Sequence, residues 1–180
     1  EVLERPLPKP TAEDYMNVRL LEALVEAGLA LEYLRRGLVR SAAGKAFQAW
    51  KALMAALLRL ELDKLKAVAR SEEERRWLES TAVPRVPTSH MKALSQLLEE
   101  VGHAKIALGT ALALNLHDYQ YHGPDPDMAL SKYRSREEAA GDILLLLREL
   151  AERVEALRGR ARWGGELEKA LGELMRELAT

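Results

Sequence analysis

The feature that most constrains this chain is its choice of apolar residues. Leucine and alanine together supply 61 of the 180 residues, whereas valine and isoleucine supply only 11. Strands favour β-branched and aromatic side chains, while leucine and alanine are among the best helix formers. We therefore expect an all-α fold. A chain of this length forms about one domain and buries roughly 70% of its unfolded surface, so it needs no metal or disulfide to fold.

Composition excludes several classes of protein. The absence of cysteine excludes a disulfide scaffold, a thiolate metal site and a cysteine nucleophile. A net charge of −1 disfavours a globally basic nucleic-acid binder. The longest nearly uncharged run, residues 106–116, is shorter than the roughly 20 residues that cross a bilayer. With no basic leader before an apolar core, we expect a cytoplasmic protein with no membrane partner. Few asparagines and glutamines beside many charged residues are typical of a thermophile.

Apolar periodicity and breaker residues divide the chain into three parts. Three prolines in residues 1–10 predict an extended arm. Residues 11–160 are expected to form an antiparallel bundle of five to six main helices, and Gly164 and Gly165 separate it from a C-terminal helix within 163–180. The expected helices of the bundle cover about 11–37, 38–69, a short segment from 71, 89–101, 103–117 and 135–158, with loops at 81–89 and 117–127.

Two of these helices have unusual patterns. The helix 103–117 is apolar nearly all round, which predicts a central helix surrounded by others. The C-terminal helix carries Leu167, Leu171, Leu174 and Leu178 at a 4-3-4 spacing. This narrow seam suits packing on the bundle or on a helix of a partner chain.

Basic residues are concentrated near the second helix. From Tyr33 to Leu60 there are six basic residues and no acidic one. Four of them are Arg40, Lys45, Lys51 and Arg59. Around the axis of a helix, Arg40 and Lys51 lie about 20° apart, and Lys45 and Arg59 lie about 40° apart. Such an arc could hold the phosphates of RNA or of a nucleotide. The alternative is a solvated face balanced by acids on neighbouring helices.

The densest group of reactive side chains is the predicted loop 117–127. It contains His117, His122, Tyr119 and Tyr121, so a histidine could act as general acid or base while a tyrosine positions a substrate. The alternative is a structural loop with a turn at Gly123. A single Glu100-x-x-His103 falls short of the paired motifs of a di-iron bundle. We therefore predict no metal and no cofactor.

Three segments of the chain together resemble the HEPN superfamily, and within it the archaeal PaREP-type proteins. They are the stretch Glu32-Tyr33-Leu34-Arg35-Arg36-Gly37, the alanine-rich helix from Leu38 to Leu53 with Trp50-Lys51, and the late histidine–tyrosine segment. The resemblance covers about residues 15–158. It implies an antiparallel helical bundle that is often homodimeric. It further implies that the chain could be a metal-independent RNase or the partner of a nucleotidyltransferase.

Such RNases carry a signature near the end of a late helix: an arginine followed, after four to six residues, by a histidine. This signature is missing on the late helix of the present chain. Thr110, Ala111 and Leu112 stand at the arginine positions before His117. Asn115, Leu116 and His117 stand at those before His122. The one formal match, Arg85 to His90, spans Pro87, and we interpret it as chance.

Three hypotheses follow. The first is a non-enzymatic, HEPN-like interaction module that forms a homodimer. The second is an RNase or nucleotide-handling enzyme that uses the 117–127 segment, and it gains support if Lys45 or Lys51 lies within reach of His117 or His122. The third is a nucleic-acid binder that uses the basic arc of the second helix.

Overall fold

The computed structural model describes residues 1–180 and is helical throughout, with no strand, which confirms the all-α class. Four long helices form its body: α1 (Tyr15–Arg35), α2 (Val39–Leu60), α7 (Ile106–His122) and α8 (Arg136–Glu155). Shorter α-helices are α3 (Leu62–Val68), α4 (Glu72–Trp77), α5 (Val83–Arg85), α6 (Met91–Glu100) and α9 (Gly165–Leu178); a π-helical turn covers Leu78–Ala82 and 3-10 turns cover Val2–Glu4 and Thr88–His90. None of these helices combines the length and the apolar character needed to cross a bilayer.

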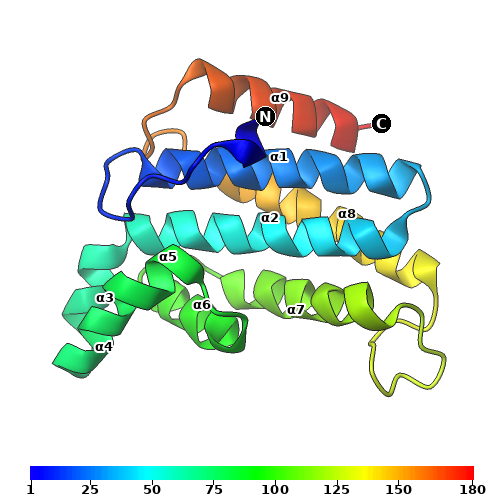
Figure 1. Ribbon diagram of the computed structural model, residues 1–180, viewed down its shortest axis with the longest axis horizontal. Helices are drawn as coiled ribbons and strands as arrows, with labels where there is room; N and C mark the ends of the chain where they lie inside the picture. The colour runs from blue at the N-terminus through cyan, green and yellow to red at the C-terminus, as the bar shows by residue number, and fades with distance from the viewer.

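The four long helices run alternately up and down. α2 packs against α1, α7 and α8, whereas α1 and α7 lie on opposite sides of α2 (Figure 1). Contacts between side chains set the antiparallel registers: Glu26 of α1 meets Lys45 of α2, and Phe47 of α2 meets His117 of α7. α2 is therefore the axis of the bundle.

The expectation that residues 103–117 form the central helix is wrong. α2 buries 15 of its 22 residues, whereas α7 buries only 6 of its 17 and lies at the edge of the bundle (Figure 1). Small side chains explain the difference, because the alanines on several faces of α2 allow three other helices to approach closely. α7 is apolar on its outer side without being covered there.

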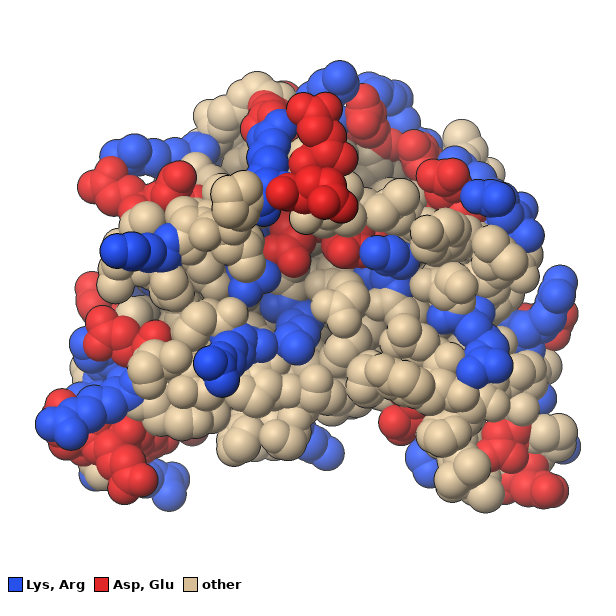
Figure 2. Space-filling model, viewed as in Figure 1, with Lys and Arg blue, Asp and Glu red and all other residues tan.

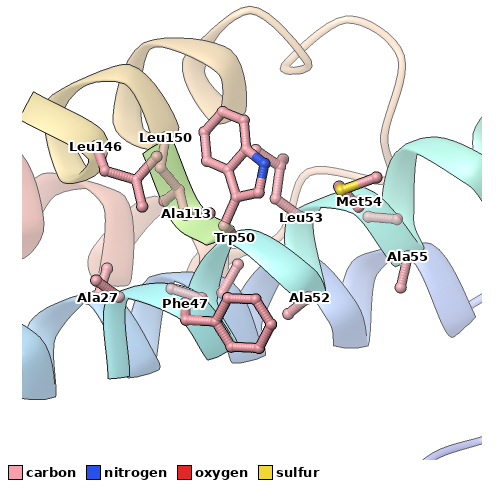
Figure 3. Close-up of a cluster of buried hydrophobic side chains, with 14 of the residues drawn as sticks. Ala27, Phe47, Trp50, Ala52, Leu53, Met54, Ala55, Ala113, Leu146 and Leu150 are labelled. Atoms are coloured by element: carbon pink, nitrogen blue, oxygen red, sulfur yellow. The ribbon is translucent and has the colours of Figure 1, made fainter. Parts of the chain in front are cut away.

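The core is centred on Trp50, whose ring rises from α2 among leucines of α8 and Ala113 of α7 (Figure 3). Its indole nitrogen donates a hydrogen bond of 3.0 Å to the hydroxyl of Thr110 on α7, which donates in turn to the sulfur of Met54 at 3.6 Å. This chain satisfies the buried polar groups at the α2–α7 contact. It also explains the polar Thr110 inside an apolar helix.

Several predicted boundaries move. The expected helix 38–69 is interrupted at Glu61, whose fully buried carboxylate pairs with Arg160 and lies 3.8 Å from His103. The expected loop 81–89 is mostly helical, because a π-helical turn at Leu78–Ala82 continues α4 directly into α5, which contains Pro84. The helix expected from residue 103 begins at Ile106, and the added short helices raise the number above the expected five to six.

Both ends of the chain pack on α1. The Pro-rich arm includes a 3-10 turn and is held by hydrogen bonds from Arg59 to the carbonyl of Pro10 and from Arg5 to Glu166. In α9, Leu167, Leu171 and Leu174 are buried against α1 and α8 of the same chain. Of the two alternatives for the leucine seam, the structure shows packing on the bundle.

Candidate functional site

The expected histidine–tyrosine loop 117–127 is helical as far as His122, so the prediction is wrong for residues 117–122, whereas residues 123–127 do form a loop. α7 ends only at Gly123, where φ is +65°. The guanidinium of Arg40 donates hydrogen bonds to the carbonyl oxygens of Gln120 (3.0 Å) and Tyr121 (2.5 Å). These carbonyls end the helix without intrahelical partners, so Arg40 extends α7 by capping it.

The helix sends the four candidate side chains in different directions. Tyr119 is 1% exposed and meets Tyr133 edge to face, so it belongs to the core. His117 stacks on Phe47 with ring centroids 4.1 Å apart and contacts the edge of Tyr121 at 5.2 Å. Tyr121 is 62% exposed, and His122 is exposed at the end of the helix. Only His117 and Tyr121 therefore share a site.

The basic arc of the second helix is divided among structural contacts. Arg40 caps α7, and Arg59 holds the carbonyl of Pro10 at 2.8 Å. The ammonium of Lys45 lies 3.0 Å from a carboxylate oxygen of Glu26, which is itself only 8% exposed. Lys51 alone of the four has neither an ion pair nor a hydrogen bond within the chain.

Lys51 stands one turn after Phe47 on α2, and Phe47 is the residue of α2 that stacks on His117. The charge of Lys51 contributes to the lowered pKa of His117. On the other side, Arg19 of α1 is held by the hydroxyl of Tyr15, by Glu22 and by the carbonyl of Pro84 at 2.8–3.0 Å. The phosphate-handling hypotheses require Lys51 within reach of His117, and the printed contact in this region is the one between Phe47 and His117.

Burial and charge set the protonation of this group. Burial lowers the pKa of His117, with Asp118 acting in the opposite direction and Lys51 adding to the decrease. Burial and then the charge of Arg19 also lower the pKa of Lys51. His117 is therefore neutral at pH 7, and its Nδ1 is buried without a hydrogen-bond partner.

A second candidate surface is the outer face of α7. Leu108 is 69% exposed, and the same face carries the exposed Ala111 and the half-buried Leu112 and Asn115. No charged side chain interrupts it between Lys105 and Asp118. Leu108 and the uncharged residues around it make this face a candidate for a protein–protein contact.

Comparison with known proteins was made with this geometry established. The model of the archaeal PaREP1/PaREP8 family matches residues 18–144, which span most of α1 through the first half of α8. The chain belongs to this family. No curated protein and no solved structure gives a significant match. In this PaREP1/PaREP8 protein the matched region contains both candidate surfaces, whereas the arm and α9 lie outside it.

Sequence reasoning missed Arg19 and Phe47 at the site and Leu108 on the outer face. Phe47 is the only phenylalanine of the chain and lies four residues before Lys51, a helical spacing that places the two side chains on one face. No local pattern connects Arg19 to Lys51, because their proximity depends on the register between α1 and α2.

Proposed function

We propose that this protein is a non-enzymatic helical interaction module that forms a homodimer through the outer face of α7. The observation that supports this proposal is the exposure of Leu108 on an uncharged face of a helix at the edge of the bundle. The leucine seam of α9 is already covered within the chain, so it is replaced here by the α7 face as the contact surface.

Charge complementarity favours a second copy as the partner. Lys105 at the start of this face and Asp118 near its end both lack an ion pair within the chain. In an antiparallel pairing of two α7 helices that cross near Ala111, each Lys105 meets the Asp118 of the other copy. The small side chain of Ala111, where the two helices cross, allows the close approach in which Leu108 is covered.

The experiment is the molar mass by light scattering at micromolar concentration. The wild type is expected to be a dimer, and Leu108→Glu a monomer, since burying an unpaired carboxylate at the contact is costly. Met175→Glu is the matched control, because Met175 is 45% exposed on α9, away from this face. A strictly monomeric wild type, or a Leu108→Glu variant that remains dimeric, would contradict the proposal.

A charge exchange tests the antiparallel register. Lys105→Asp and Asp118→Lys each place like charges together at both ends of the contact and should weaken the dimer. The double variant restores opposite charges and should recover the wild-type affinity. Failure of the double variant to recover would exclude this pairing even if Leu108 lies in the interface.

The finer assignment to the HEPN superfamily is also part of this proposal. The alternating arrangement of α1, α2, α7 and α8 supports it, as does the family match. The absence of an arginine four to six residues before His117 or His122 favours a binding role over RNA cleavage. Incubation of the protein with labelled RNA tests this point: cleavage that is lost in His117→Ala would favour the enzyme instead.

A further inference from the structure

We propose that the cavity between the N-terminal arm, α1 and the start of α9 binds a linear aliphatic polyamine. Its volume of about 640 Å³ is within the usual range for small-molecule sites. The cavity lies on α1, at the opposite side of the bundle from α7 (Figure 1), so it is independent of the proposed dimer. Asp and Glu atoms gather at the upper centre of the face in Figure 2, where the arm crosses α1 in Figure 1.

The cavity is a groove along one face of α1. Four residues of its floor follow one another at intervals of four: Asp14, Val18, Glu22 and Glu26. Residues with this spacing are neighbours on a helix, so they form a single row. At the helical rise, the row extends about 12 Å from Asp14 to Glu22 and about 18 Å from Asp14 to Glu26. The arm forms one wall and residues 162–167 form the other, so a ligand that fills the groove is long and narrow.

Both ends of the groove carry carboxylates that the chain leaves incompletely bonded. Asp14 stands at the start of α1 without capping it, and the nearby Arg162 pairs with Glu13 instead. At the other end, Glu26 is only 8% exposed. Lys45 balances its charge at 3.0 Å, but the buried Oε2 of Glu26 has no hydrogen-bond partner. Because buried carboxylates are normally hydrogen-bonded, a ligand that donates to Glu26 would complete this end of the groove.

The middle of the groove is apolar. Its lining there comes from α1, from the arm and from α9, and consists of Val18, Leu21, Leu7 and Leu167. Methylene groups that lie against such side chains are removed from water, which is favourable. A hydrated metal ion gains nothing from this surface. The groove therefore combines charge at its ends with an apolar surface between them.

These features identify the class of ligand. Carboxylate oxygens only accept hydrogen bonds when ionised, so the ligand must supply donors, and cationic donors bind them most strongly. An anion is disfavoured, because Arg5 at the rim already donates to both carboxylate oxygens of Glu166, at 3.1 and 3.0 Å. A linear polyamine such as spermine has ammonium groups at both ends and methylene groups between them, and in its extended form it reaches from one acidic end towards the other.

The test is calorimetric titration of the protein with spermine in a low-salt buffer, with propylamine and Mg²⁺ as comparison ligands. We expect spermine to bind about tenfold or more tightly than either, because only spermine reaches both ends of the groove. Asp14→Asn should weaken spermine binding by about tenfold, since it removes a charged acceptor. Asp127→Asn is the matched control, because it removes the same charge from an exposed loop outside the groove, and it should bind spermine like the wild type.

A second pair of variants separates shape from charge. Val18→Trp fills the middle of the groove without changing the net charge, and it should weaken spermine binding by about tenfold or more. Val68→Trp introduces the same ring at a 50% exposed position of α3 and should bind spermine like the wild type. Circular dichroism melting of all four variants checks that each is folded.

Equal binding of spermine by the wild type, Asp14→Asn and Val18→Trp would overturn the site. Binding of propylamine or Mg²⁺ as tightly as spermine would overturn the elongated ligand. Equal weakening by Asp14→Asn and Asp127→Asn would mean that overall charge attracts spermine, and would contradict the groove. Binding of a lysine-rich peptide but not of spermine would assign the groove to a protein partner and would likewise contradict the proposal.

Discussion

Two glycines at the α2–α7 contact show how much a single methyl group can matter. A Cβ on Gly109 would lie 2.3 Å from the ring of Trp50, which is fully buried and hydrogen-bonded to Thr110. A Cβ on Gly44 would lie 2.6 Å from the side-chain amide of Gln120. The ring has no free space in which to move, whereas the end of a flexible glutamine has.

Gly109→Ala should therefore lower the free energy of unfolding by about 1–3 kcal/mol, the usual cost of overpacking a core. Gly44→Ala should remain within about 1 kcal/mol of the wild type, because alanine is the better helix former. Urea denaturation of both variants measures the difference. Equal losses of stability in the two variants would show that the Trp50 ring is not confined as described.

Among the elements, α7 depends most on a contact outside itself. Its last turn carries His122 and the exposed Tyr121, and its carbonyls are held by Arg40 of α2. A cap from another helix connects the length of α7 to the packing of α2. The position of the exposed Tyr121 therefore depends on a residue of another helix.

Arg40→Met should allow the last turn of α7 to fray and should lower the free energy of unfolding by about 1 kcal/mol. Hydrogen exchange should increase at the amides of residues 119–123 and stay unchanged in the first turns of α7. Arg36→Met is a suitable control, because Arg36 is exposed and makes only a 3.8 Å ion pair with Glu32. Unchanged exchange at the end of α7 would mean that Arg40 does not act as its cap.

At the scale of the whole molecule, α9 completes the bundle. It covers α1 and α8 with three buried leucines, and its start is connected to the arm through Arg5 and Glu166. Leu108, the most exposed of the large apolar side chains, is on α7, at the other side of the bundle (Figure 1). Folding and association therefore use different surfaces.

Leu171→Ala should lower the free energy of unfolding by about 2–5 kcal/mol, as expected for a fully buried leucine. The molar mass of the folded protein should be unchanged. Met175→Ala, at a half-exposed position of the same helix, should have little effect on either quantity. If Leu171→Ala instead dissociated a dimer at unchanged stability, α9 would be the interface and the proposal for α7 would fall.

Periodicity and composition alone predicted the all-α class, the long helices α1, α2 and α8 and the shorter α9, because helix formation and amphipathic patterning are local properties. The same local patterns did not predict which helix is central. Neighbouring helices approach the alanine-rich α2 more closely than they approach α7, which is apolar on nearly all sides. This difference depends on how the helices pack and not on the pattern of either helix alone. In the same way, Lys51 and Tyr121 were identified from the sequence as separate candidates among eight. Only the tertiary structure gave Arg40, Lys45 and Arg59 partners and brought Phe47 to His117, because contacts between residues distant in sequence depend on the registers between helices.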